Sequence, residues 1–541
     1  MRDAPTDRDR ARSNAYDRVL YDGASFPQTH PARLSTVAAL FGLRAPAPEG
    51  CRVLELGCGN GSNLVPMAAA MPHARFVGVD LAATPIARGR ERAARLGLSN
   101  LRLEQADVSR LGAALGRFDY VIAHGLYSWV PAAVRPHVLR VAGEVLSDDG
   151  VAYVSYNALP GCRLRHLVRE LVRMHFGTTA FEPERIAEVR AFLAEVARVE
   201  AARDGEFVGV LQREIAFVQS LPDHVLYHDD LATESHAFLL TDVLDDARSR
   251  GLQFLGEAAV AEMFTLAGFP DFDRMLADWS GGDRVRREQH LDFMRGRRFR
   301  QTLLCRAHHR LTDDAGPQAL RAMHLRASLG AQADAVLFDR SEVRFSDGSR
   351  GARIDEPIAK AALARLAARW PDTVAFDALL DGALRDCAAH GAPADDPRAA
   401  GAALAALLWS MVRADLVEPL RDAPPRAAPP GVRPRLRAVV ADALAHGLVP
   451  ADALNRGFRL DDAIARRLAA AMDGTRDRHA LLALARPVSG PPIADAAADG
   501  GSGPAPRADA APTTDPAPDT DAALRLERLI AFLHGHGAFA G

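Results

Sequence analysis

The 541-residue sequence predicts an α/β fold: a Rossmann-like, mostly parallel sheet with a helical insertion, followed by smaller helical or winged-helix-like modules. Three observations predict this fold. Apolar runs of strand length alternate with helical stretches over the first 160 residues, which is the pattern of βαβ units. A glycine-rich turn follows the first of these runs, at Gly57 to Gly61. After residue 310 the pattern changes: one strand candidate, Glu342–Ser346, is followed by short helical stretches.

Five apolar runs are expected to form parallel strands at the centre of the sheet. Such runs are typical of strands that helices cover on both faces. Two later runs are expected to complete the sheet, and the helical stretch from Arg163 to Ser220 then forms an insertion before them. The five strands are Cys51–Leu56, Arg75–Asp80, Leu101–Asp107, Phe118–His124 and Gly150–Asn157, and the two later strands are Gly251–Gly256 and Phe299–Cys305.

The turn after the first strand has three glycines at alternate positions. Glycine has no Cβ, so the backbone at Gly57, Gly59 and Gly61 can press against a ligand. Ser62 or Asn63 can cap the helix that follows, so the turn opens onto a helix N-terminus. The spacing is G-x-G-x-G, not the G-x-G-x-x-G of dinucleotide enzymes. It predicts a cradle for a nucleotide-type ligand, although three glycines alone can also form a plain turn.

Carboxylates end the second and third strands. Asp80 lies 19 positions after Gly61, close to the roughly 20-residue spacing at which a carboxylate meets ribose hydroxyls in doubly wound folds. Asp107 ends the third strand, where this fold usually meets the adenine ring. Leu81 and Val108 follow the two carboxylates and are predicted to bind the same ligand. The register of these elements favours nucleotide binding over a doubly wound domain that binds nothing.

The glycine turn, with Glu55 two residues before it, resembles motif I of class I S-adenosylmethionine (SAM) methyltransferases. Most of the chain is similar to one bacterial family, the SAM methyltransferases with a methyltransferase regulatory domain, which includes bacterial protein-lysine methyltransferases. Cys162 and His290 depart from this family, which commonly has tryptophan and tyrosine there. The matching segments are Phe26–Pro31, Glu55–Gly61, Phe118–Pro131, Val154–Gly161, Leu226–Asp230, Arg287–Phe293, Phe299–Leu304, Leu460–Asp462 and Met472–Asp477.

The resemblance implies a methyltransferase that uses SAM as its cofactor. It further implies that the methyl acceptor is a lysine side chain of a protein substrate. The residues expected to hold the cofactor come from the glycine turn and from the ends of the first four strands. They are Glu55, Gly57, Cys58, Gly59, Gly61, Asp80, Leu81, Asp107, Val108 and His124.

Aromatic residues follow the fourth strand, at the carboxyl edge where ligands bind in this topology. Aromatic faces can stabilise a sulfonium cation there by about 0.5–2 kcal/mol. We predict that His124 and Tyr127 are the catalytic residues that orient the acceptor, with ordinary loop packing as the alternative. The expected substrate channel is lined by Tyr21, Trp129, Tyr156 and Asn157.

Two other functions fit the same motifs. One is methylation of a small molecule, with the C-terminal modules as regulators. The other is a SAM-sensing protein without turnover, whose winged-helix-like region contacts nucleic acid or a partner. The arginines between Arg284 and Arg300 could form a local basic patch for such a contact, with solvated helix surface and sheet packing as the alternative. A metal site at His224, His228 and His236 is disfavoured because methyl transfer from SAM needs no metal, so no metal is expected.

The composition predicts a cytoplasmic protein. Hydrophobic residues make up 48% of the chain and the formal net charge is −3, so no general attraction to nucleic acid or to a membrane surface is expected. No apolar run approaches the roughly 18 residues of a membrane span, and the charged N-terminus does not resemble a secretory signal. The five scattered cysteines suggest neither a zinc site nor a disulfide framework. The expected partners are a protein substrate, which the resemblance implies, and a second copy of the chain. The helical insertion is a natural place either for dimerisation or for substrate selection.

Changes in composition divide the chain into predicted regions. The first is an N-terminal arm, which contains Tyr16 and Tyr21. In many class I methyltransferases such a leading segment folds over the cofactor as a lid, and a surface arm packed on the outside is the alternative. The terminal helix has Leu526, Leu529 and Leu533 on one face and is expected to dock onto the body. The regions are 1–49 (arm), 50–160 (SAM-binding core), 161–310 (insertion, regulatory region and last strands), 311–421 (winged-helix-like), 432–486 (small helical module), 487–520 (disordered linker) and 521–541 (terminal helix).

Overall fold

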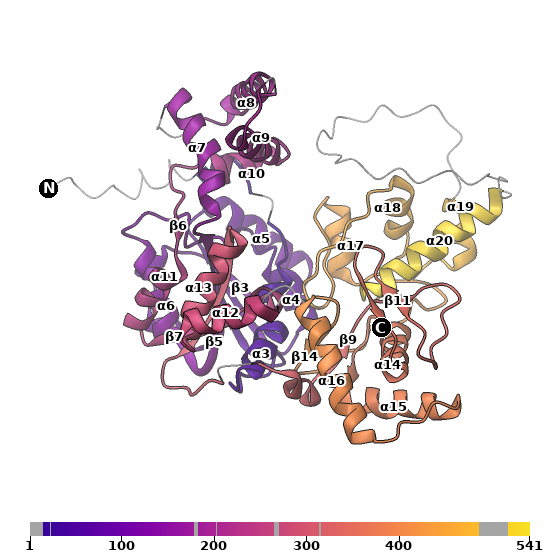
Figure 1. Cartoon of the computed structure of the whole chain (residues 1–541). Coiled ribbons are helices and arrows are strands. Elements are labelled where there is room, and N and C mark those ends of the chain that lie inside the picture. The colour runs from indigo at the N-terminus through magenta and orange to yellow at the C-terminus, as the bar shows by residue number, and fades with distance from the viewer. Residues whose placement is uncertain are drawn as a thin grey trace.

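The computed structural model describes residues 15–21, 23–177, 182–201, 203–264, 270–312, 315–485 and 518–541. The N-terminal half and the C-terminal half lie side by side, and helices α3 and α16 lie near their junction (Figure 1). Helix α3 spans Pro31–Leu40 and α16 spans Pro397–Arg413. Most of the predicted linker, and the first 14 residues of the arm, lie outside the described residues.

The N-terminal half is built on a sheet with strand order β3-β2-β1-β4-β5-β8-β7, and the short β6 also pairs with β5. The first five strands in that order are parallel, and β8 is antiparallel to both of its neighbours. This order confirms the predicted Rossmann-like sheet, including the two late strands. The strands are β1 (Arg52–Leu56), β2 (Arg75–Asp80), β3 (Leu101–Gln105), β4 (Phe118–Ala123), β5 (Leu146–Ala158), β6 (Ala237–Phe238), β7 (Leu252–Glu257) and β8 (Phe299–Arg306).

Strand β5 begins four residues before its predicted start at Gly150. The polar residues Ser147 to Asp149 suggest a turn from their sequence, but the structure keeps them extended because Leu146 pairs with Phe118. The pairing then shifts register between Phe118 and Tyr120. Such an irregularity accommodates extra residues in one strand without ending it.

Both faces of the sheet are covered by helices, which explains the continuous apolar strands. Successive residues of β4 alternate between the two cores: Tyr120 and Ile122 belong to one, and Val121 belongs to the other. The first core includes side chains of α3, α4 (Leu64–Ala70) and α5 (Ala83–Arg95). The second includes side chains of α6 (Arg135–Val145) and α11 (Leu240–Ser249). The sheet is therefore buried on both sides, and its edges and strand ends remain for ligands.

The insertion after β5 forms a helical subdomain with its own small core, at the top of Figure 1. Its helices are α7 (Cys162–Phe176), α8 (Ile186–Glu200), α9 (Glu206–Gln219) and α10 (Asp223–Val225). A π-helix, η5 (Leu226–Asp230), continues α10. Helices α12 (Pro270–Ser280) and α13 (Arg284–Arg295) lie between β7 and β8.

The described residues from 315 to 421, in the C-terminal half, form two small sheets and three α-helices. One sheet has the order β13-β9-β14 and the other β10-β11-β12. The helices are α14 (Pro357–Arg369), α15 (Phe376–Ala389) and α16. The strands are β9 (His324–Arg326), β10 (Gly330–Ala331), β11 (Val343–Ser346), β12 (Gly351–Ile354), β13 (Val374–Ala375) and β14 (Glu418–Leu420). The comparison of this part with a winged helix stays a prediction.

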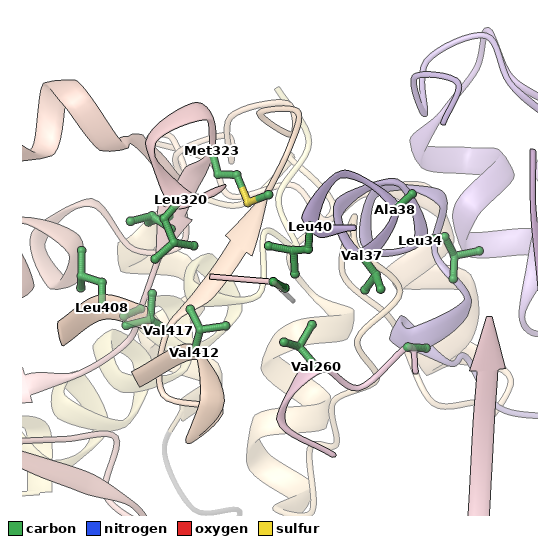
Figure 2. Packing of buried hydrophobic residues seen from close by; sticks show 14 of the residues in the cluster. Leu34, Val37, Ala38, Leu40, Val260, Leu320, Met323, Leu408, Val412 and Val417 are labelled. Carbon is green, nitrogen blue, oxygen red and sulfur yellow. The ribbon is translucent and has the colours of Figure 1, made fainter. Parts of the chain in front are cut away.

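One hydrophobic core runs through both halves. Figure 2 shows Leu40 of α3 and Val260 of the N-terminal half close to Met323 and Val412 of the C-terminal half. All four side chains are nearly or fully buried. Burying apolar surface from both halves in one cluster stabilises their association, so the halves are expected to behave as one folded unit.

The last module contains α17 (Ala438–Ala445), α18 (Ala463–Ala470), α19 (Arg478–Ala485) and α20 (Pro518–Gly535). Leu526, Leu529 and Leu533 of α20 are buried against α18 and α19, so the predicted docking of the terminal helix is confirmed. No helix among the described residues has the length and hydropathy needed to cross a bilayer.

Candidate active site

The glycine turn connects β1 to α4 and has a backbone that only glycine adopts readily. Gly57 and Gly59 have φ values of 74° and 53°, in the left-handed region that L side chains rarely occupy. The Gly57 N–H donates to Val79 O at 2.8 Å, which ties the turn to the end of β2. A Cβ at Gly59 would meet no protein atom within 4 Å, so the backbone there is open to a ligand.

Asp80 at the end of β2 organises the same turn. Its Oδ2 accepts a hydrogen bond from Gly59 N at 2.8 Å and its Oδ1 accepts one from Ala82 N at 2.9 Å. Each carboxylate oxygen has a second lone pair, which can accept a ribose hydroxyl. Burial raises the pKa of Asp80, while the hydrogen bonds from Ala82 and Gly59 lower it. The next residue, Leu81, is 53% exposed and offers an apolar surface to a flat ring.

Asp107 and Val108 follow β3, beside Asp80. The Asp107 side chain caps a short 3-10 helix, Val108–Arg110, through hydrogen bonds from Ser109 N at 2.9 Å and Ser109 Oγ at 2.7 Å. Val108 is half-buried against the second core. The structure therefore brings both predicted adenine-side residues to the same sheet edge as Asp80, and it gives Asp107 a structural role as well.

Glu55 in β1 is buried directly before the glycine turn. Its Oε1 accepts a hydrogen bond from Asn63 Nδ2 at 2.8 Å, and its Oε2 is buried without a hydrogen-bond partner among the described residues. Burial raises the pKa of Glu55 to about 8, and the hydrogen bond from Asn63 offsets part of that rise. A cationic group arriving from a ligand would satisfy Oε2 and favour the carboxylate.

Asn63 connects the glycine turn to distant parts of the chain. Its Oδ1 accepts hydrogen bonds from Phe26 N at 2.9 Å and from Asn455 Nδ2 at 2.7 Å. Asn63 sits at the start of α4, but its side chain makes no cap hydrogen bond, so the predicted capping role is wrong. The three-way contact among Asn63, the arm and the C-terminal module is invisible in the sequence, because the partners lie 37 and 392 positions away.

His124 lies at the end of β4 in an apolar setting. Its ring packs against Phe26, with centroids 3.7 Å apart, and its Nδ1 shares a hydrogen bond with the Tyr153 hydroxyl at 2.9 Å. Burial lowers the pKa of His124 to about 4. The imidazole is therefore neutral at physiological pH and adds no positive charge to this part of the site.

Tyr127 and Tyr156 point into the second core. The Tyr127 hydroxyl donates to Asp246 of α11 at 3.4 Å, and Tyr156 shares a hydrogen bond with Thr302 at 2.9 Å. Both rings are almost fully buried. The structure therefore does not bring the Tyr127 hydroxyl to His124, and the contacts of both tyrosines are those of core packing. The sequence could not separate these roles, because Tyr127 follows β4 and Tyr156 lies near the end of β5, both toward the ligand-binding edge.

Trp129 and Asn157 lie at the same edge as His124 and are partly buried. Asn157 ends the pairing of β5 with β8 and donates its backbone N–H to Ser128 Oγ at 2.8 Å. Cys58 is buried within the glycine turn, where burial raises the pKa of its thiol. The thiol is thus protonated at physiological pH and lines the turn as a small apolar group.

The N-terminal arm lies across the cofactor end of the sheet. Asp17 of α2 (Ala15–Arg18) accepts a hydrogen bond from Thr84 N of α5 at 2.8 Å. A Cβ at Gly23 would come within 2.6 Å of Asn60 Oδ1, so the arm passes directly over the glycine turn. Tyr21 approaches the insertion, with its ring 5.6 Å from that of His228. The arm therefore packs on the glycine turn and on α5, and its role as a lid stays a prediction.

The three histidines considered for a metal do not converge. His228 donates from Nε2 to Val19 O at 2.7 Å, whereas His236 lies beyond the π-helix and pairs with Glu234 at 2.7 Å. Within the part of the chain that the structure describes, no group of three or more His, Cys, Asp or Glu side chains could hold a metal ion.

Two family models match the chain. A methyltransferase domain matches residues 53–150, which contain the glycine turn, Asp80 and His124. A family described as a predicted methyltransferase regulatory domain matches residues 222–306, which contain the π-helix and β7. The first match covers β1 to β4, which carry the glycine turn, and the second covers the other edge of the sheet, with β7 and β8.

Proteins of Rickettsia are similar to this chain. The uncharacterized protein RP789 of Rickettsia prowazekii is 37% identical over 295 residues, which cover 54% of this chain and 53% of RP789. The uncharacterized protein RP028 of the same organism is 28% identical over 241 residues, 44% of this chain and 96% of RP028. The chain thus matches about half the length of the first relative and nearly all of the second.

The solved structure of PKMT2 from Rickettsia typhi in complex with AdoHcy has the same fold. The TM-score is 0.81 and the sequence identity is 21%, over 96% of this chain and 100% of that chain. The likeness covers both halves described above. This likeness shows the fold. The matched methyltransferase domain and methyltransferase regulatory domain, with the glycine turn and its two carboxylates, identify the chain as a SAM-dependent methyltransferase with SAM as its cofactor.

Proposed function

We propose that this protein transfers the methyl group of SAM to lysine side chains of a protein substrate. The observation that carries the proposal is the architecture shared with PKMT2 of R. typhi, solved in complex with AdoHcy, over 96% of this chain, together with the resemblance of the sequence to bacterial protein-lysine methyltransferases. The environment of His124 also supports it. A neutral amine is the nucleophile of such a reaction, and a buried, uncharged channel favours a neutral amine over an ammonium ion.

When bound, SAM supplies an electrophilic methyl group: the nitrogen lone pair forms the new N–C bond, the C–S electrons remain on sulfur, and the product ammonium loses a proton to water. The protein's own residues position and desolvate the reactants. Asp80 and the glycine turn would hold the ribose end, and Leu81, Asp107 and Val108 would hold the adenine. Phe26 and His124 would exclude water beside the transferred methyl group.

The chain itself is a poor acceptor, which simplifies the test. Lys360 is its only lysine. The Lys360 side chain is fully buried, and Nζ donates to Val336 O at 2.8 Å, to Ser341 O at 2.9 Å and to Asp339 at 3.1 Å. A folded enzyme should therefore show very little label on itself.

The test is incubation of the full chain with methyl-labelled SAM and cellular proteins. Half of the acceptor sample is first acetylated, which blocks lysine amines. We expect label on the untreated proteins only, and methyl-lysine after complete hydrolysis. Equal labelling of acetylated proteins, or label on carboxylates, RNA or small molecules, would contradict the lysine assignment and leave methyl transfer in place. An Asp80→Asn variant serves as the control for cofactor-dependent labelling.

A further inference from the structure

The arm and the insertion meet in a cluster of aromatic and acidic side chains, the arm–insertion cluster: Tyr16, Tyr21, His228 and Asp229. The Tyr16 ring stacks on His228, with centroids 4.2 Å apart and planes 9° apart. The Tyr21 ring lies edge-on to the same imidazole, with centroids 5.6 Å apart. It is also edge-on to the Tyr16 ring, with centroids 6.5 Å apart. The cluster thus unites residues about 210 positions apart in the chain.

Asp229 is a half-buried carboxylate with little charge compensation. The neighbouring guanidinium of Arg165 binds Asp230 through two hydrogen bonds, at 2.8 and 2.9 Å, and reaches Asp229 only at 3.5 Å. Burial raises the pKa of Asp229 to about 6, and Arg165 offsets only part of that rise. A carboxylate in this condition gains stability when a further cation arrives.

The cluster borders the cofactor site. Burial is the main cause that raises the pKa of the Tyr16 hydroxyl above its ordinary value. The carboxylates of Asp229 and Asp80 raise it further, so both act on Tyr16 electrostatically. Its neighbour Asp17 contacts the first turn of α5, which follows Asp80. The arm therefore links α5, which follows the predicted ribose ligand, to the π-helix that carries Asp229.

The cluster is also open to solvent. Tyr16 and Tyr21 are each 36% exposed, so both rings can be reached from solvent. His228 and Asp229 belong to a π-helix, and single π turns inside helices occur frequently at functional sites. The π-helix of the insertion therefore places Asp229 in the same cluster as the exposed rings of Tyr16 and Tyr21, on the side of the predicted cofactor site.

We propose that the arm–insertion cluster receives the ammonium group of the acceptor lysine before methyl transfer, with the Tyr16 and Tyr21 rings around the cation and Asp229 as its counter-charge. The inference rests on the proposed lysine methylation. Aromatic faces and a carboxylate attract an alkylammonium ion. Within the cluster His228 is neutral, because burial lowers its pKa, so it does not compete with the cation. The ammonium must then release its proton to water, since only the neutral amine has the lone pair that forms the N–C bond.

The binding test compares two peptides that differ only in the ammonium group. One peptide contains lysine, and the other contains norleucine, which has the same straight apolar chain and no charge. Binding to the full chain loaded with AdoHcy is measured by fluorescence. The wild-type protein should bind the lysine peptide roughly ten- to hundredfold more tightly. Asp229→Asn should reduce that ratio to about one. Equal binding of both peptides to the wild-type protein would overturn the inference, whether or not any variant folds.

The kinetic test separates acceptor binding from a merely structural role of the arm. In Asp229→Asn the KM for the lysine peptide should rise about tenfold or more, while the Kd for SAM stays within about twofold of wild type. Asp223→Asn, on the same segment with an exposed carboxylate, serves as the matched control and should change neither value. A parallel loss of SAM affinity would mean that the cluster only fastens the arm. If wild-type enzyme methylates no lysine at all, the proposed function fails instead.

Discussion

Asp80 is the residue whose chemistry is most clearly defined by its contacts. Both of its oxygens accept backbone N–H groups, from Gly59 and Ala82, and each retains a lone pair for the cofactor. Asp80→Asn removes the charge and one acceptor. We expect SAM affinity to fall roughly ten- to hundredfold, because hydrogen bonds to a charged group contribute about 1.5–3 kcal/mol. Isothermal titration calorimetry measures the change.

The control for Asp80 is Glu104→Gln on the neighbouring strand, where the carboxylate is exposed and pairs with Arg102. This variant should bind SAM like the wild type. Thermal unfolding must first show that Asp80→Asn keeps an intact fold, because the Asp80 side chain also orders the glycine turn. Unchanged affinity in such a protein would remove Asp80 from the cofactor site.

Glu55 should make the stability of the cofactor-free protein depend on pH. Its pKa is raised from 4.5 to about 8 in the folded protein by burial. Between these values the unfolded chain binds fewer protons than the folded one, so stability falls as pH rises. Glu55→Gln keeps the acceptor for Asn63 and removes the titration. Its Tm should exceed that of the wild type by about 2–4 °C at pH 8.5, and the difference should disappear near pH 4.5. A difference that is equal at both pH values would contradict the raised pKa.

At the scale of elements, Glu418 joins parts of both halves. It accepts hydrogen bonds from Arg33 of α3 at 2.9 Å, from Arg326 of β9 at 2.6 Å, and from Arg456. Burial alone would raise the pKa of Glu418, but Arg326, Arg456 and Arg33 hold it well below its usual range. Its contribution is therefore present above the ordinary pKa of 4.5 and is lost as pH falls below that value.

Glu418→Gln should destabilise the protein because it leaves three partly buried guanidinium groups without their shared carboxylate. We expect a loss of about 2–4 kcal/mol in the free energy of unfolding at pH 7, measured by urea denaturation, and a smaller loss at pH 4. The matched control is Glu342→Gln. Glu342 pairs with Arg353, and both of these side chains are exposed. Such a surface pair contributes about 0–1 kcal/mol. Equal losses in the two variants would show that the cluster does not stabilise the junction.

At the scale of the whole molecule, the C-terminal half reaches the cofactor turn. Asn455 donates to Asn63 Oδ1 at 2.7 Å and to Asn63 O at 3.2 Å, and Asn63 in turn binds Glu55. The shared hydrophobic core holds the two halves in this arrangement. A residue outside both matched domains therefore orders the methyltransferase turn.

Asn455→Ala should weaken SAM binding although Asn455 lies far from the glycine turn in sequence. Loss of one neutral hydrogen bond, at about 0.5–1.5 kcal/mol, corresponds to a roughly twofold to tenfold higher Kd. Calorimetry on the full chain measures it. Asn455→Asp is the companion variant: it keeps an oxygen but cannot donate, and it should weaken binding at least as much. Wild-type affinity in both variants would leave the turn independent of the C-terminal half.

The sequence was sufficient for features that depend on neighbouring residues. Arg75–Asp80 is the β2 strand with the bounds that its apolar run predicts, and Gly57, Gly59 and Gly61 have the positive φ values for which glycine is suited. The order of apolar runs and the glycine spacing also carried the resemblance to the methyltransferase family. Backbone conformation and burial pattern are local properties, so they can be inferred from a short window of residues.

The meeting of side chains from distant segments required the folded structure. Asn63, Phe26 and Asn455 join at the glycine turn, Tyr16 stacks on His228, and Tyr127 turns into the core toward Asp246. Each contact depends on how helices pack on the sheet and on how the two halves share one core. Packing involves many weak contacts between residues far apart in sequence, so no local pattern specifies which polar side chains it brings together.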